Sequence, residues 1–166
     1  MFDADLEGRM AALTHDFGKG LTKKEHMPKH YGHDVNGVPV VEKFCDRLKV
    51  PTKMKTRLMY VCRFHMSMHK LDELTPKTYV KMFMEMNAWN DPTVIDLLYA
   101  LGVFDERGRL GSENNSVDQL LKLYDVWDAV FNVKFVDVFP NGETNVNKIQ
   151  DGLFKARCNV IGKMNE

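Results

Sequence analysis

Histidines and a carboxylate that could bind a metal ion gather in the first half of this chain. His15 and Asp16 are adjacent in the sequence. Further histidines follow at His30, His33, His65 and His69. Neutral imidazole nitrogens and carboxylate oxygens are the ligands that zinc, manganese, nickel and iron prefer in proteins. The grouping predicts a divalent-metal site and, as its chemistry, metal-dependent hydrolysis.

The spacing of apolar residues predicts that helices position these groups. Apolar side chains recur three or four residues apart almost throughout, and only residues 132–139 alternate with period two. We therefore predict an almost wholly α-helical fold. Gly18 and Gly20 can terminate the first helix, so the adjacent histidine and aspartate should lie near its end.

Two further helices should carry the other histidines. A second helix is expected to open at Asp34 or Asn36, with His33 at its entrance. In the third, His65 and His69 are four residues apart and share one face. The histidines thus fall on separate elements, which the fold must bring together.

The second half of the chain also reads as helices. A capping residue followed by proline occurs at Thr75-Pro76 and again at Asp91-Pro92, and both pairs signal helix starts. Helices are expected over residues 76–87 and 92–101, from Ser116, and from near Asn145. Residues 104–109 are expected to form a charged turn.

The composition favours one intracellular domain. The chain has 166 residues, and its 23 basic and 23 acidic residues give zero formal net charge, so it carries no overall electrostatic footprint for nucleic acid. Cys45, Cys62 and Cys158 fit reduced thiols better than a disulfide framework. No apolar stretch approaches the roughly 18 residues of a membrane span, and the acidic start lacks the pattern of a secretory signal. We expect a soluble, cytoplasmic protein with no membrane partner.

One helical domain is the economical prediction for residues 1–166. We expect its core over about residues 5–110 and a C-terminal helical extension over about residues 116–163. No internal repeat is visible, and the only candidate linker is the Gly/Asn/Ser-rich stretch 111–116.

A series of short motifs occurs in order along the chain. They are THDFGKGLT at residues 14–22, KHYGH at 29–33, RFHMSMH at 63–69, TPKT at 75–78 and DERGR at 105–109. Their order and spacing resemble the HD phosphohydrolase domain at the C-terminal end of certain bacterial tRNA nucleotidyltransferases, the multifunctional CCA-adding proteins. Weaker similarity continues to Val160, so the resemblance covers nearly the whole chain.

The resemblance implies roles for several residues. His15 and Asp16 would be metal ligands at the catalytic site, and Asp105 would be the distant carboxylate that completes it, unless Asp105 is an ordinary turn residue. His33 and His65 would hold a second metal or donate hydrogen bonds to phosphate, with satisfied polar histidines as the other interpretation. The implied cofactor is a divalent ion such as nickel, manganese, cobalt or magnesium.

Other residues of these motifs could contact the substrate. Lys19 could place a positive charge on a substrate phosphate during catalysis, or it could be a solvated lysine that favours a helix C-terminus. The remaining substrate-binding candidates are Lys29, His30, Arg107 and Arg109. We expect His69 to be structural or exposed.

This chain departs from the resembling family in three respects. The nucleotidyltransferase head has no counterpart, so CCA addition is not expected. HD domains generally place one more histidine before the His-Asp pair, and no histidine precedes His15 in this sequence. Met66 stands where the family often has an acidic residue.

The leading hypothesis is a metal-dependent phosphohydrolase or phosphodiesterase for nucleotides or RNA ends. The substrates implied by the resemblance are 2′,3′-cyclic nucleotides, 2′-nucleotides and phosphomonoesters. The alternative is a catalytically impaired module that binds tRNA or a protein partner, and a third option is hydrolysis of a signalling nucleotide. Association into a homodimer is left open.

Overall fold

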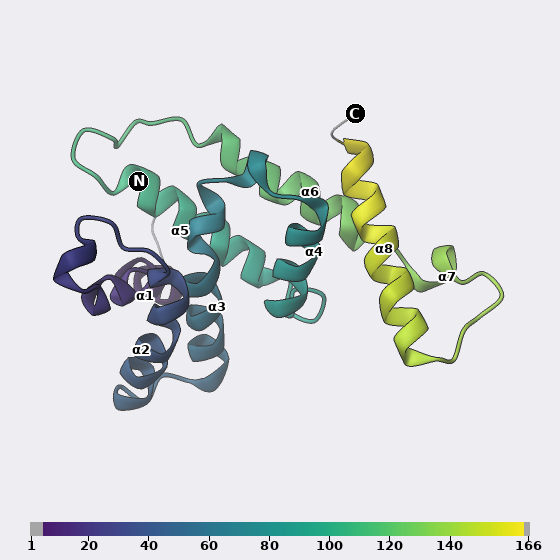
Figure 1. The fold of residues 1–166 in the computed structure, drawn as a ribbon, viewed down its shortest axis with the longest axis horizontal. Helices are drawn as coiled ribbons and strands as arrows, with labels where there is room; N and C mark the ends of the chain where they lie inside the picture. The colour runs from purple at the N-terminus through teal and green to yellow at the C-terminus, as the bar shows by residue number, and fades with distance from the viewer. Residues whose placement is uncertain (1–4, 165–166) are drawn as a thin grey trace.

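Helices make up the described part of the chain. We analysed a computed structural model that describes residues 5–164, and within them it contains eight α-helices, four short 3-10 helices and no β-strand (Figure 1). The α-helices are α1 (Leu6–Thr14), α2 (His33–Arg47), α3 (Thr52–Met68), α4 (Pro76–Glu85), α5 (Thr93–Arg107), α6 (Lys122–Phe131), α7 (Phe135–Val138) and α8 (Val146–Met164). The 3-10 helices are η1 (Phe17–Leu21), η2 (Lys24–His26), η3 (Leu71–Glu73) and η4 (Asp118–Leu121). The predicted all-α class is confirmed. Residues 1–4, on which the expected absence of a secretory signal depends, lie outside the described residues.

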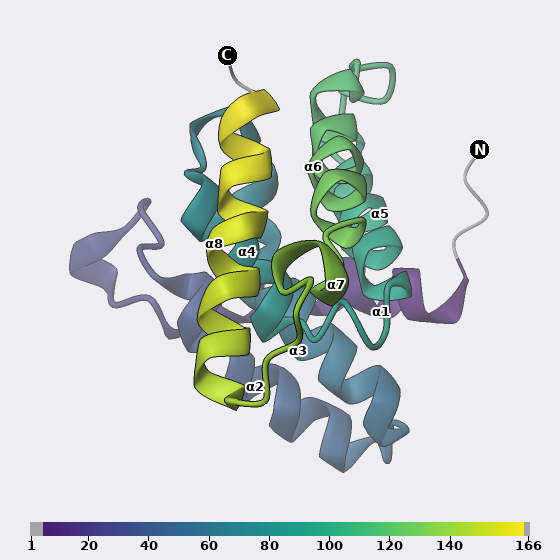
Figure 2. The same ribbon diagram turned by 90° about the vertical axis from the view of Figure 1, so that its right-hand side faces the viewer.

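The elements of the predicted metal site pack around α3 and α5. Helix α3 lies against α2 and α5, and α1 also contacts α3 and α5. Helix α8 packs along α4 and α6 at the other end of the molecule (Figures 1 and 2). Buried side chains such as Leu58, Phe83, Leu98, Trp127 and Ile161 belong to one hydrophobic cluster. Burial of this cluster supplies the main favourable term for folding, and it holds α3 and α5 in fixed positions behind the site.

Helix α5 is longer than the sequence suggests, and the expected charged turn over residues 104–109 is wrong. The helix continues through Gly102 to Arg107, so Asp105 lies on its last turn. A Cβ at residue 102 would lie 3.1 Å from Met68 Cε and 3.2 Å from Leu120 Cδ1. Gly102 therefore permits close packing of neighbouring elements and does not end the helix.

Residues 132–139, the stretch in which apolar residues alternate, contain a helical turn. Residues 132–139 contain α7, where alternation over so few residues cannot distinguish a strand from one helical turn. Helix α8 begins at Val146, close to the expected start near Asn145.

The start of α4 provides a simple test of the predicted helix caps. Thr75 Oγ1 accepts a hydrogen bond from the backbone N–H of Thr78, and Pro76 occupies the first helical position. Thr75→Ala should lower the free energy of unfolding by about 1 kcal/mol because this N–H loses its partner. Thr75→Ser should retain most of that stability in urea unfolding. Equal losses for the two variants would contradict the capping role.

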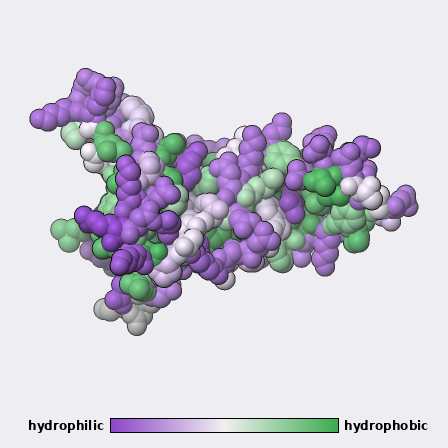
Figure 3. Space-filling model, turned by 90° about the horizontal axis from the view of Figure 1, so that it is seen from below, coloured by the Kyte–Doolittle hydropathy of each residue, from purple (hydrophilic) through white to green (hydrophobic). Residues whose placement is uncertain are grey.

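None of the helices within residues 5–164 is both long and apolar enough to cross a bilayer. On the face seen in Figure 3, hydrophilic residues cover most of the surface, and hydrophobic residues are scattered along it. Scattered hydrophobic residues are normal on a protein surface.

Candidate metal centre

Two facing glycines bring the His-Asp segment against α2. A Cβ on Gly18 would lie 1.9 Å from the carbonyl oxygen of His33 and 2.8 Å from the backbone nitrogen of Gly37. A Cβ on Gly37 would in turn lie 2.9 Å from Cys62 Sγ. Only hydrogen fits at these positions, so the backbone of η1 lies directly on α2. This contact brings Asp16, at the start of η1, close to the N-terminus of α2.

The thiol of Cys62 further secures this junction. Its Sγ lies 3.4 Å from the carbonyl oxygen of His15 and donates to it. Burial raises the pKa of Cys62 to about 12, so the group stays a protonated donor. None of the cysteines, all of which lie within residues 5–164, forms a disulfide. The predicted reduced thiols therefore agree with the structure.

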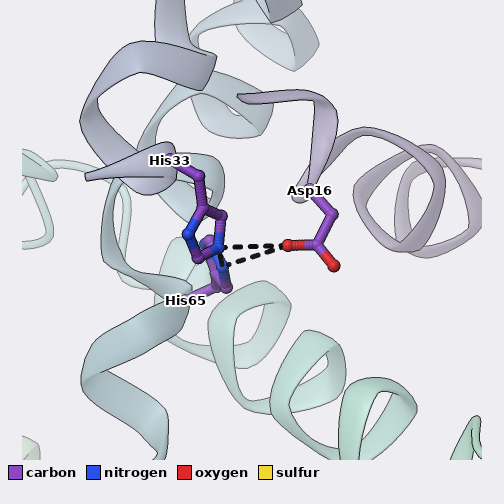
Figure 4. A group of neighbouring side chains, drawn as sticks. All are labelled: Asp16, His33 and His65. Carbon is purple, nitrogen blue, oxygen red and sulfur yellow. Dashed lines mark hydrogen bonds and ion pairs between the residues drawn. The ribbon is translucent and has the colours of Figure 1, made fainter. Parts of the chain in front are cut away.

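Asp16, His33 and His65 converge from three different elements (Figure 4). Asp16 Oδ1 lies 3.1 Å from His33 Nε2 and 3.6 Å from His65 Nε2. The two Nε2 atoms are 3.0 Å apart. The side chains of the histidines are almost fully buried, at 8% and 3% exposure respectively. These three atoms form a group with the size and chemistry of a metal site.

The Nδ1 atoms of His33 and His65 both donate to backbone carbonyl oxygens. His33 Nδ1 lies 2.7 Å from the carbonyl oxygen of His30, and His65 Nδ1 lies 2.7 Å from that of Cys62. A carbonyl can only accept, so both Nδ1 atoms are donors, and each neutral ring presents a lone pair at Nε2. Burial lowers the pKa of His65 to about 4, which keeps this ring neutral.

Electron-pair donors therefore face one another inside the protein. Asp16 Oδ1 is buried and makes no hydrogen bond within residues 5–164. It points toward the two Nε2 lone pairs, and a buried acceptor without a donor is costly. A cation among these three atoms would satisfy all of them, so the donor set fits a divalent metal ion.

A second group of candidate ligand side chains lies at the other carboxylate oxygen of Asp16. His15 Nδ1 donates to the carbonyl oxygen of Ala12 at 2.9 Å, which leaves Nε2 facing Asp16 Oδ2 at 3.3 Å and Asp105 Oδ1 at 3.8 Å. Burial lowers the pKa of His15, but the nearby carboxylates of Asp105 and Asp16 outweigh that effect and raise it to about 9. These contacts also hold the pKa of Asp105 well below its usual range. A proton on His15 thus occupies a place that a metal ion could take.

Asp16 connects the two groups through its two oxygens. Oδ1 faces His33 and His65, whereas Oδ2 faces His15 and lies 2.5 Å from Lys19 Nζ. Burial raises the pKa of Asp16, but hydrogen bonds from His15 and Lys19 reverse this and lower it below the usual range. Asp16 therefore has one carboxylate oxygen in each group.

An open cleft of about 620 Å³ lies above these groups. Its lining includes Asp16, Lys19, His30, Tyr31, Gly32, His33, Asp34, His65, Met66, His69, Lys70, Asp105 and Arg109. Arg109 Nη2 lies 3.7 Å from Asp105 Oδ1. Lys70 makes no side-chain ion pair within the described residues. Together with Lys19, these cations give the cleft positive charge beside its carboxylates. Small-molecule sites have volumes in this range, roughly 300–1,000 Å³.

The structure separates the predicted substrate residues into two sets. His30 and Arg109 line the cleft, and His30 Nδ1 is 2.9 Å from Thr22 Oγ1. Lys29 and Arg107 are not among the lining residues. Lys29 Nζ lies 5.9 Å from the centre of the Tyr31 ring, and Arg107 Nε donates to the carbonyl oxygen of Asn115.

His69 is exposed, as expected, and it also lines the cleft. Its Nε2 lies 2.8 Å from Asp105 Oδ2, a contact that the sequence did not predict. The signal was its position four residues after His65, one helical turn away. The contact of His69 with Asp105 could not be predicted, because Asp105 was expected to lie in a turn and not on a helix. Lys70 and Tyr31 also line the cleft and were not predicted to be site residues.

Removing His69 should weaken the site without removing a proposed ligand. We expect His69→Ala to lower the affinity for manganese about 10–100-fold, because residues that orient a ligating group have effects of this size. Competition with a fluorescent chelator measures this affinity. His26→Ala is the matched control, since His26 is exposed and contacts Glu25 outside the cleft. If both variants bind manganese equally well, His69 does not support the metal site.

The comparison with known families agrees with this geometry. The model of the HD domain matches residues 4–130, which is more than half of the chain and includes all of the candidate site residues. No solved structure matches the chain. HD domains in general bind divalent metals and are metal-dependent phosphohydrolases. This chain belongs to the HD-domain family.

Proposed function

We propose that this protein is a metal-dependent phosphohydrolase or phosphodiesterase that acts on nucleotides or RNA ends. The observation that carries the proposal is the convergence of Asp16 Oδ1 with two imidazole lone pairs, whose other ring nitrogens are committed to carbonyl oxygens. A divalent cation among these atoms would be bound by all three of them. The cleft above it adds separate positive charges suited to a phosphate.

The residues divide into two ligand groups with Asp16 in common. His33 and His65 would hold one ion with Oδ1, and His15 and Asp105 would hold a second with Oδ2. A bound divalent ion supplies Lewis acidity toward a phosphate oxygen and lowers the pKa of water, so that hydroxide is available near neutral pH. The backbone carbonyls at Nδ1 keep the rings oriented toward these positions.

The cations of the cleft would bind and orient the phosphate. Lys19 Nζ contacts Asp16 Oδ2, which holds the ammonium group beside the proposed ligands. Arg109 can engage phosphate oxygens through two N–H groups, whereas Lys19 and Lys70 act as point charges. With the substrate in place, these charges would offset the negative charge on the phosphoryl oxygens in the transition state.

The preference for nucleotides and RNA ends rests on sequence. The motif series at residues 14–22, 29–33, 63–69, 75–78 and 105–109 resembles the HD domain of CCA-adding proteins. The substrates that this resemblance suggests are 2′,3′-cyclic nucleotides, 2′-nucleotides and phosphomonoesters. We include tRNA ends among the proposed substrates for the same reason.

A catalytically impaired module that binds tRNA or a protein partner is the second candidate. The observation that favours it is Met66, an apolar side chain that lines the cleft where the resembling domains often carry an acidic residue. Such a module would keep the fold and its positive charges but would not turn over substrate.

Hydrolysis by the intact chain distinguishes the two candidates. The protein is stripped with a chelator, loaded separately with manganese, nickel, cobalt or magnesium, and assayed on 2′,3′-cyclic AMP, 2′-AMP and a simple phosphomonoester. Turnover with at least one ion supports the proposed hydrolase. Folded, metal-loaded protein that is inert with all of them would overturn it. Retention of RNA at physiological salt by inert protein would then favour the binding module.

A further inference from the structure

A second, smaller pocket adjoins the cleft and has no role in the proposed chemistry so far. Its volume is about 330 Å³, and we call it the side pocket. It is lined by Gly18, Leu21, Thr22, Lys23, His26, Tyr31, His33 and Asn36. Tyr31 and His33 line both the side pocket and the cleft. A ligand in the side pocket would therefore lie next to the metal centre.

Tyr31 presents an aromatic ring between the two pockets. It is 75% exposed, unlike most large aromatic side chains of this protein, which pack in or against the core. It precedes Gly32, whose φ of 68° turns the chain into α2. Lys29 Nζ, at 5.9 Å from the ring centre, is the charged group beside it. An exposed ring at this position can stack on a planar ligand, and nucleic-acid bases bind to aromatic side chains in this way.

Asn36 is an uncommitted polar group of the side pocket. Its side chain is exposed on the first turns of α2 and makes no hydrogen bond within the described residues. Thr22 pairs with His30, and both Lys23 and His26 approach Glu25. An asparagine amide offers donors and an acceptor together, the pattern that pairs with the N6 and N7 edge of adenine.

We propose that the side pocket binds the base of an adenine nucleotide whose phosphate lies at the metal centre. Tyr31 stacks on the base, and the Asn36 amide pairs with its edge. The volume of the pocket falls at the lower end of the range for small-molecule sites, roughly 300–1,000 Å³, which suits one part of a ligand better than a whole one. The placement of the phosphate rests on the proposed function, whereas the recognition of the base rests on the side pocket alone.

Binding of inert analogues tests the base subsite without requiring turnover. The probes are the phosphonate analogues of AMP and of ribose 5-phosphate, in which carbon replaces the bridging oxygen, so neither can be hydrolysed at that bond. They differ only in the base. Calorimetry with the manganese-loaded full chain should show that the adenosine analogue binds at least about tenfold more tightly, the range expected for stacking of one base.

Two variants of Tyr31 separate stacking from a structural role. Tyr31→Ala should weaken binding of the adenosine analogue about tenfold and leave binding of the ribose analogue unchanged. Tyr31→Phe should bind both analogues like the parent, because the ring remains. A third probe is the phosphonate analogue of UMP, and Asn36→Ala should reduce the preference for the adenosine analogue over this uridine analogue. Thermal unfolding of each variant verifies that it is folded.

Different results would contradict the base subsite and the proposed function. Equal binding of both analogues, or equal weakening of both by Tyr31→Ala, would overturn the base subsite. Binding of both that is unaffected by a chelator would instead indicate that the phosphate does not lie at the metal centre, which would count against the proposed function. If the protein prefers the adenosine analogue but turns over no substrate, the base subsite is supported and only the proposed hydrolysis is contradicted.

Discussion

Asp16→Asn should abolish metal binding and reduce hydrolysis of 2′,3′-cyclic AMP by more than about a hundredfold. Loss of a residue that only orients a ligand typically costs about 10–100-fold, and Asp16 is shared by both proposed groups of ligands. Asparagine keeps the size of the side chain but removes the negative charge that pairs with the cations. The bound metal is counted by mass spectrometry, and turnover is measured with manganese.

The matched control for this variant is Asp46→Asn. Asp46 is exposed and pairs with Lys55 on the surface, away from the cleft, so its replacement should change neither metal content nor turnover. Exposed pairs of this kind contribute about 0–1 kcal/mol to stability. If Asp16→Asn keeps full metal content and turnover, the site proposed here is wrong.

Gly18→Ala should destabilise the protein and dismantle the metal centre together. A Cβ at this residue would lie only 1.9 Å from the carbonyl oxygen of His33, so η1 would have to move away from α2. Overpacking of this kind costs typically about 1–3 kcal/mol and sometimes more. We expect a loss near the upper end of that range, because the obstructing atoms belong to the backbone. Urea unfolding measures the stability, and the chelator competition described for His69 measures the metal affinity.

Gly20→Ala provides a control in the same 3-10 helix. A Cβ at this residue meets no atom within 4 Å, so the variant should have the stability and metal affinity of the parent within about 0.5 kcal/mol. A similar loss for both variants would show that η1 needs glycine for backbone freedom. It would contradict a requirement for close contact with α2.

Local sequence signals predicted much of the fold because its helices begin with strong signals. The Thr75-Pro76 signal and the start expected near Asn145 both correspond to helix starts in the structure. Gly102 misled the prediction, since its small size serves packing against Met68 and Leu120 while the helix continues. A glycine alone cannot reveal which of these two purposes it serves.

The sequence also contained the chemistry of the candidate site, but not its geometry. Asp16, His33 and His65 were recognised as potential ligands by residue type and by resemblance. Their convergence depends on α2 and α3 packing together, and the tight contact of η1 with α2 depends on two glycines that carry no functional signal of their own. The pairing of His69 with Asp105 needed the extended course of α5, which no local pattern indicated.

One peptide plane joins the metal centre to the side pocket. The carbonyl of His30, which accepts the Nδ1 proton of His33, belongs to the amide that begins Tyr31. An amide is rigid and planar, so a rotation of the chain at Tyr31 turns this carbonyl with it. The imidazole of His33 can follow that rotation or lose its partner. A displacement of the Tyr31 backbone therefore acts on the orientation of a proposed metal ligand through one rigid peptide group.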